Sequence, residues 1–386
     1  MATGFPHRVF GGGACLALVA LIVGWSTLDP LGARSSASGL LTPRLRSDFH
    51  RGVNHAHVHR RGRGYGSSVS AAELAALRRI GVDSITLTPF AYQRTATADR
   101  VAGFPGHGTG RGLHRLDPTM TDDDLAAEIA NAQRLALRVV LKPHIWSHDF
   151  LSGIEWHGTI RQTSADAHMR WWDSYQAFVL HYAVLAERHG VDALAIGTEL
   201  VTMTLGHPKE WKDLIVRVRG VYRGALTYVA HHGREFEEIG FWSDLDMIGL
   251  GAYFPLEAPN GAGVGKLVRA WRPHRRRIEA VQARLGRPVV FFEIGYRPVS
   301  EAHQRPWEYD GGRLDLTAQS RSYEALFQAF ADADWWHGVY FWKTFTDPRK
   351  NRGHRPESVF SFRHRPAEAV VRRWFGGSSE STIGAE

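Results

Sequence analysis

Two glutamates in this 386-residue sequence are the side chains best placed to do chemistry. Glu199 closes the apolar run LAIGTE, and Glu293 closes the apolar run VVFFE. An ionised carboxylate that follows such a run is costly to bury unless it has partners. Two carboxyls that meet at one site can share the work of a general acid and a nucleophile. The alternative is that each glutamate forms a core salt bridge with one of the many arginines.

A histidine-rich stretch, GVNHAHVH, occupies residues 52–59. In an extended strand His55, His57 and His59 point the same way, because side chains alternate with a period of two. Neutral imidazoles at this spacing could bind zinc or donate hydrogen bonds to a ligand. A hydrogen-bonded core histidine is the alternative for each of them. His59 is expected to lie already in the following loop.

The elements that must position these residues follow one repeated pattern: a short apolar run, a polar loop and an amphipathic helix. The predicted strands are Gly52–His57, Ser84–Pro89, Arg138–Trp146, Ala193–Leu200, Ala225–His231, Met247–Phe254, Pro288–Tyr296 and Gly338–Phe345. The predicted helices lie near 70–80, 122–136, 168–189, 208–222, 264–285, 317–332 and 366–375. Ser70 with Glu73, and Thr121 with Asp124, have the spacing of capping boxes for the first two helices.

Eight strands alternating with helices predict an α/β fold, a single (β/α)8 TIM barrel over residues 49–376 with no second domain. The alternative is an open doubly wound sheet. That fold would favour a G-x-G-x-x-G loop after the first strand, and RGRGYGSS does not match it.

An apolar run precedes the barrel, from Ala14 to Trp25. Its length suits a signal peptide better than a comfortable membrane span, and a membrane anchor is the alternative. We therefore predict a signal or anchor over 1–27, a flexible tether over 28–48 and a disordered tail over 377–386. The protein is expected to be exported, either secreted or anchored to the outer face of the membrane, with no other membrane contact. The single cysteine, Cys15, lies in this segment.

The net charge of +8 comes mostly from arginines that are spread along the chain. A solvated basic surface explains this distribution better than a nucleic-acid stripe, so no nucleic-acid partner is predicted. Nothing in the sequence specifies an oligomeric state.

In a TIM barrel the reactive groups stand at the carboxyl ends of the strands. Many polar side chains fall at those ends and predict a lined pocket. Besides the two glutamates, the candidates for contact with a substrate are His55, His57, Lys142, His144, Trp146, Thr198, His232, Tyr253 and Trp342.

Together, the segments LKPHIW…WHGTI, AIGTEL and VVFFEIGYRP resemble the family 113 β-mannanases of glycoside hydrolase clan A, over residues 50–375. The resemblance implies a retaining hydrolase of β-linked hexose chains, with β-mannan as the first substrate to consider. It implies Glu199 as the acid/base, Glu293 as the nucleophile, Tyr253 as a hydrogen-bond donor to that nucleophile and Trp342 as a sugar platform. Such a mechanism needs neither a metal nor an organic cofactor.

One position departs from the clan pattern. Thr198 precedes the acid/base where many clan A families have an asparagine that bonds the sugar 2-OH. A threonine is compatible with a sugar that has an axial 2-OH, as mannose does.

Two other functions stay open at this point. A metal-dependent, amidohydrolase-like barrel could use His55 and His57, but its sixth strand should end in a histidine, and GLGAYFP has none. A barrel that binds carbohydrate without cleaving it is the second alternative, although two carboxylates give a pure binding site no advantage.

Overall fold

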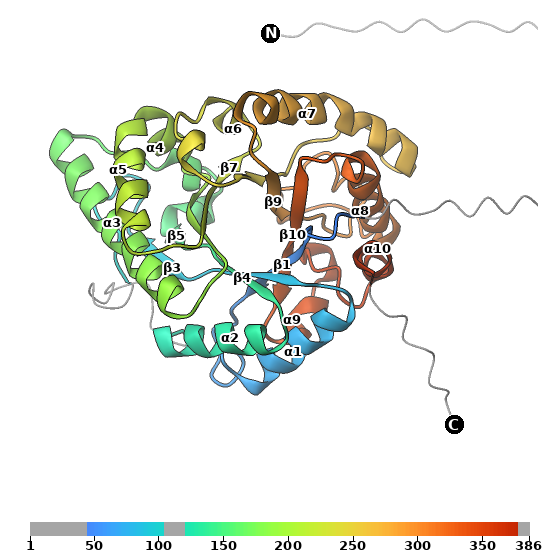
Figure 1. Cartoon of the computed structure of the whole chain (residues 1–386). Helices are drawn as coiled ribbons and strands as arrows, with labels where there is room; N and C mark the ends of the chain where they lie inside the picture. The colour runs from blue at the N-terminus through green and yellow to red at the C-terminus, as the bar shows by residue number, and fades with distance from the viewer. Residues whose placement is uncertain (1–44, 104–119, 377–386) are drawn as a thin grey trace, which may run out of the picture. The chain divides into compact units, whose positions relative to one another are not determined.

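The computed structural model describes residues 45–103 and 120–376. Eight parallel strands close a barrel in the order β1-β10-β9-β8-β7-β6-β4-β2 (Figure 1). They are β1 (His50–Ala56), β2 (Ser84–Leu87), β4 (Arg138–Leu141), β6 (Ala193–Thr198), β7 (Ala225–His231), β8 (Ile248–Gly251), β9 (Val289–Ile294) and β10 (Trp336–Phe345). The predicted (β/α)8 barrel is confirmed, and each of its strands overlaps a predicted one.

Helices surround the barrel (Figure 1). They are α1 (Ser68–Arg79), α2 (Asp122–Arg134), α3 (Ala165–Arg188), α4 (Val201–Gly206), α5 (Pro208–Arg219), α6 (Glu235–Glu238), α7 (Val264–Leu285), α8 (Leu316–Phe330), α9 (Pro348–Arg352) and α10 (Pro366–Phe375). Short 3₁₀ turns cover His148–Ser152, His157–Thr159, Trp242–Asp244 and Pro356–Ser358. The sequence did not predict α4 or α9, because elements of five or six residues carry too little periodicity.

The period-two alternation of the strands divides the core into two layers. The large layer lies between strands and helices and includes the fully buried rings of Trp171, Trp211 and Trp271. A small second cluster collects alternate residues of the barrel strands: Val140, Ala193, Ala195, Val229, Val290, Phe292 and Tyr340. These side chains fill the barrel, so the reactive groups can stand only at its ends.

One predicted strand has the wrong extent. The run Arg138–Trp146 is divided into β4 and a separate strand β5 (His144–Ser147), which pairs in parallel with β3 (Phe90–Gln93). Pro143 and Pro89 stand at the two breaks, and a proline has no N–H to continue the ladder. The two-stranded sheet of β3 and β5 therefore continues the neighbouring barrel strands β2 and β4 beyond the barrel.

His55 lies in the core on the helix side of β1. Its Nε2 is 3.0 Å from Ser70 Oγ and 3.4 Å from Glu128 Oε1, and its Nδ1 is 3.3 Å from Thr344 Oγ1. Ser70 Oγ also donates to Glu128 Oε1 at 2.5 Å. Burial opposes ionisation of Glu128, but its bonds from His55, Ser70 and Gly66 outweigh that effect and lower its pKa. The network ties β1 to α1 and α2.

This network also corrects one predicted helix cap. The N-cap of α1 is Ser67, whose side chain accepts from the Ser70 N–H, so the box predicted from Ser70 and Glu73 was wrong. The box of Thr121 with Asp124 is confirmed at the start of α2.

The chain divides into two units, Met1–Leu41 and Thr42–Glu386, and every described residue belongs to the second. The predicted segments 1–27 and 377–386, and 28–44 of the predicted tether, lie outside the described residues. Within the described ranges, no helix combines the length and apolarity that a membrane crossing requires. Export stays a prediction.

Replacing His55 with alanine is expected to lower the free energy of unfolding by about 2–4 kcal/mol, because the buried Glu128 loses its imidazole partner. Urea denaturation of the wild type and the variant measures this difference. The exposed His354, replaced in the same way, is the control and should change stability by less than about 0.5 kcal/mol. Unchanged stability with a raised KM would instead show that His55 contacts the substrate.

Candidate active site

An ion pair between Lys142 and Glu293 forms the centre of the candidate active site. Lys142 comes directly after β4 and is fully buried, and its Nζ contacts Oε1 of Glu293 in β9. His144 Nε2 lies 3.5 Å from the same oxygen. Burial lowers the pKa of Lys142, and Glu293 opposes that shift. The predicted grouping of Lys142 and His144 is therefore present, and both side chains converge on Glu293.

Glu199 follows β6 directly, in a backbone conformation that side chains rarely adopt. Its φ is 52°, in the left-handed region. Its Oε1 is buried and has no hydrogen-bond partner among the described residues. Burial, followed by the charges of Glu293 and Glu235, raises the pKa of Glu199 well above its ordinary 4.5. The structure thus favours a protonated Glu199 beside a lysine-paired Glu293.

Gly251, at the end of β8, makes room for the Glu199 carboxyl. A Cβ atom at Gly251 would overlap Glu199 Oε1, so the approach depends on the missing side chain. The same Cβ would lie 3.5 Å from the nearest backbone oxygen, that of Ala230, which is an ordinary contact. A side chain at position 251 would therefore clash only with the carboxyl of Glu199.

Tyr253 lies near both carboxyls. It is 8% exposed, and its pKa is raised well above 10.0 by burial first and then by Glu293 and, more weakly, Glu199. In the described part of the chain, however, no hydrogen bond joins its hydroxyl to Glu293. The phenol therefore remains a neutral donor beside the pair.

Trp342 provides a flat surface next to the pair. Its ring is parallel to His144, with 6.3 Å between centroids and 6° between planes, and its Nε1–H donates to Tyr309 Oη at 2.8 Å. Lys142 Nζ and Lys343 Nζ lie 5.3 Å and 4.5 Å from the centroid of this ring. Burial lowers the pKa of Lys343 to about 8, with Glu293 opposing and Lys142 adding to the shift. Trp342 is half-buried, and these contacts fix the orientation of its ring.

Two more predicted residues carry polar atoms that lack a partner among the described residues, Thr198 Oγ1 and His232 Nδ1. Thr198 adjoins Glu199, and the His232 ring stacks on the exposed Trp307 at 5.4 Å. Burial, with His231 as the next cause, lowers the pKa of His232 to about 2, so the ring is neutral. Buried polar atoms are normally bonded, so these two are suited to hydrogen-bond a ligand.

The family model of Glycoside Hydrolase Family 113 matches residues 53–360, most of the chain and all of the site just described. The chain belongs to this family. It is therefore a glycoside hydrolase, and the resemblance inferred from its strand ends is confirmed.

Solved structures agree with the family. A GH113 β-1,4-mannanase in a complex is 25% identical, with a TM-score of 0.71 over 86% of this chain and 99% of that one. A GH113 β-mannanase from Alicyclobacillus acidocaldarius, in complex with ManMIm, is 28% identical, with a TM-score of 0.72 over 85% and 97%. A β-glucuronidase from Ruminococcus gnavus, 12% identical, shares the fold alone, with a TM-score of 0.57 over 86% of this chain and 52% of that one. No curated protein gives a significant match.

Three predicted substrate-binding residues of the family 113 enzyme do not join the carboxyl pair. His55 is buried behind β1, as described above. The half-buried His57 accepts a hydrogen bond from the Tyr65 N–H at 2.9 Å, in the loop after β1. Trp146 packs edge-to-face on Phe150, with 5.8 Å between ring centroids. Phe150 separates it from His157, the ring that contacts His144. With its imidazole nitrogens facing core partners, His55 is also a poor metal ligand.

Sequence reasoning missed Glu235, which is fully buried and whose charge acts on Glu199. Glu235 accepts from Thr204 Oγ1 at 2.7 Å, from Tyr228 Oη at 2.8 Å and from the His231 N–H at 2.7 Å. Tyr228 Oη in turn accepts from the N–H of Leu200, the residue after Glu199. Burial raises the pKa of Glu235 to about 7. In the run EFEE, no feature of the sequence separates this buried carboxyl from its exposed neighbours.

Gly251→Ala in the family 113 enzyme is expected to reduce kcat/KM by about 10²-fold or more, because the new methyl group displaces the Glu199 carboxyl. The melting temperature should change little, since only the end of a side chain must move. Glycosidase kinetics and thermal unfolding measure the two effects. Gly265→Ala in α7, where the nearest atom is 3.7 Å away, is the matched control. Full activity in Gly251→Ala would contradict the role of this contact.

Proposed function

We propose that this glycoside hydrolase cleaves β-linked hexose chains of the β-mannan type with retention of configuration. The observation that carries the proposal is the unequal environment of the two carboxyls. Glu199 has a raised pKa and an unbonded buried oxygen, whereas Glu293 contacts the ammonium group of Lys142. Carboxyls whose environments differ in this way divide into an acid and a nucleophile.

In the proposed first step, a carboxylate oxygen of Glu293 attacks the anomeric carbon. The bond from that carbon to the leaving oxygen breaks, and the Glu199 proton passes to this oxygen. In the second step, the ionised Glu199 takes a proton from water, whose oxygen attacks the anomeric carbon and releases Glu293. Lys142 compensates the charge of the free carboxylate before and after the reaction.

The proposed sugar contacts come from other groups at the same end of the barrel. Trp342 offers its face to a sugar ring, and large flat side chains suit that contact. Thr198 and His232 offer unbonded polar atoms, and Tyr253 offers a phenol. The two GH113 neighbours are β-mannanases, and this supports mannan as the substrate. We omit His55 and His57 from the proposed set because their side chains have partners away from the pair.

Incubating the full chain with manno-, gluco-, xylo- and galacto-oligosaccharides tests this proposal. Cleavage of the manno-series is expected, unchanged by a chelator at 25 °C, and about 10³-fold or more slower in Glu293→Gln. Proton NMR of the first product should show the β anomer, because two displacements retain configuration.

Each other outcome has a distinct meaning. The α anomer as first product would show inversion, and cleavage of another series would replace mannan. Unchanged turnover in Glu293→Gln would remove the nucleophile assignment. Binding without cleavage of every series would favour a barrel that only binds carbohydrate. Chelator-sensitive turnover with an unchanged melting temperature would favour metal-dependent hydrolysis.

The raised pKa of Glu199 also predicts a pH-dependent stability. Between its ordinary pKa of 4.5 and its higher folded value, the folded state binds more protons than the unfolded state. Stability therefore falls as pH rises through that window. Glu199→Gln is expected to melt at a higher temperature than the wild type at pH 7 and at nearly the same temperature at pH 4.

Thermal unfolding across this pH range measures the difference. Glu238→Gln, at a side chain that is 45% exposed, is the control and should shift melting by less than about 1 °C at both pH values. A Glu199→Gln variant that is less stable than the wild type at pH 7 would contradict the buried, protonated acid.

A further inference from the structure

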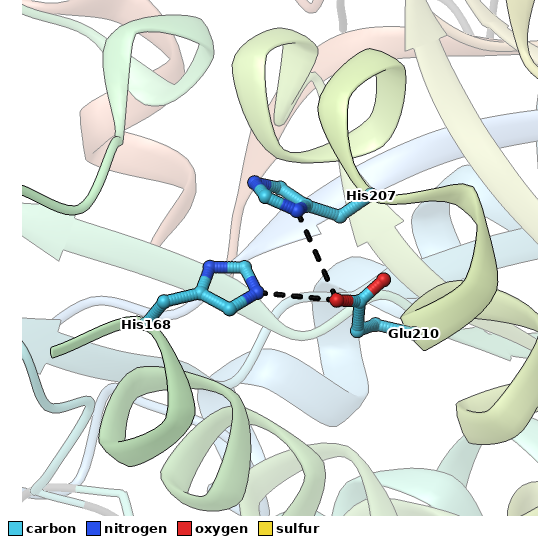
Figure 2. A group of neighbouring side chains, drawn as sticks. All are labelled: His168, His207 and Glu210. Carbon is cyan, nitrogen blue, oxygen red and sulfur yellow. Dashed lines mark hydrogen bonds and ion pairs between the residues drawn. The ribbon is translucent and has the colours of Figure 1, made fainter. Parts of the chain in front are cut away.

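Two histidines and a glutamate converge outside the carboxyl site, where the first turns of α3 and α5 meet (Figure 2). His168 lies in the first turns of α3, His207 directly precedes α5, and Glu210 lies in the first turn of α5. Glu210 Oε1 is 3.3 Å from His168 Nε2 and 3.9 Å from His207 Nδ1. All three ligand atoms lie within 4.8 Å of one another.

These separations are close to those of a tetrahedral zinc site. Zinc bonds to histidine nitrogen and carboxylate oxygen are about 2.0–2.1 Å long, which places the ligand atoms about 3.3–3.4 Å apart. One of the two carboxylate separations already has this value, and the other is about half an ångström too long. The two imidazole nitrogens lie within 4.8 Å of each other, and binding an ion requires the three side chains to move closer together. The donor set, two imidazoles and a carboxylate, is one that zinc commonly takes.

A simple ion pair explains less of this arrangement. It accounts for either imidazole beside Glu210, but not for the contact between the two rings, whose centroids lie 4.0 Å apart. Two protonated imidazoles so close would repel each other.

Access and charge also fit an ion. The three side chains are 20%, 34% and 33% exposed, in the order His168, His207 and Glu210, so solvent reaches the site. A fourth position can therefore hold water. One of the three groups is a carboxyl, and carboxylate oxygen is an accepted zinc ligand.

We propose that His168, His207 and Glu210 form a Zn²⁺ site with one position open to water. The ion joins α3 to α5. It also fixes the end of α4, the short helix that begins two residues after Glu199 and ends at Gly206, directly before His207. The site is structural: it takes no part in the two displacement steps and does not depend on the proposed function.

Isothermal titration of the full chain, stripped of metal, with zinc sulfate tests the site. One zinc ion per chain is expected, with an affinity at least tenfold weaker in His207→Ala and in Glu210→Gln. Zinc should raise the melting temperature of the wild type, because an ion that binds only the folded state stabilises it. The increase should be lost in both variants.

His181→Ala is the matched control, since His181 pairs with Asp122 at 3.0 Å without a second histidine in that pair. It should bind zinc as the wild type does. Equal zinc affinity in the wild type and in both site variants would overturn the proposal, as would no zinc-dependent melting in the wild type. Loss of the zinc effect in His181→Ala alone would place the ion elsewhere.

Discussion

The structure depends on holding two carboxyls together in a poorly solvated site, where like charges repel and burial disfavours ionisation. Lys142 compensates the negative charge of Glu293 by direct contact. The raised pKa of Glu199 keeps that carboxyl protonated, which removes the second negative charge. The lysine is itself buried, so each member of the group is tolerated only because the others are present. Removing one charge would leave another without compensation.

The barrel supplies the backbone positions that this group needs. β4, β6 and β9 end at the same face, although their residues are far apart in sequence. β4 ends at Leu141, and Pro143 follows Lys142 and redirects the chain. His144 therefore begins a new strand and still reaches Glu293. Gly251 leaves space that no other residue would leave. A filled barrel interior keeps all these groups at the rim.

The sequence allowed the barrel and the two glutamates to be predicted for one reason. Parallel strands in a barrel all end at one face, so polar residues that follow apolar runs must gather there. The same reasoning failed for His55, since alternation shows which residues share a face but not which face is inward. Asn54 takes the inward direction, donating to the carbonyls of Phe292 and Tyr340, and His55 therefore points to the helices. Glu235 and the pair of His168 with Glu210 depend on contacts between distant helices and loops, which no local pattern encodes.

The left-handed backbone of Glu199 has a consequence for the evolution of the family. Glycine and asparagine adopt this conformation more readily than glutamate, so the local fold favours replacing the carboxyl. A relative that no longer needed hydrolysis would gain stability by replacing this glutamate with glycine or asparagine. On this physical ground, we expect a relative with glycine or asparagine at the equivalent place to have lost hydrolysis while keeping the barrel.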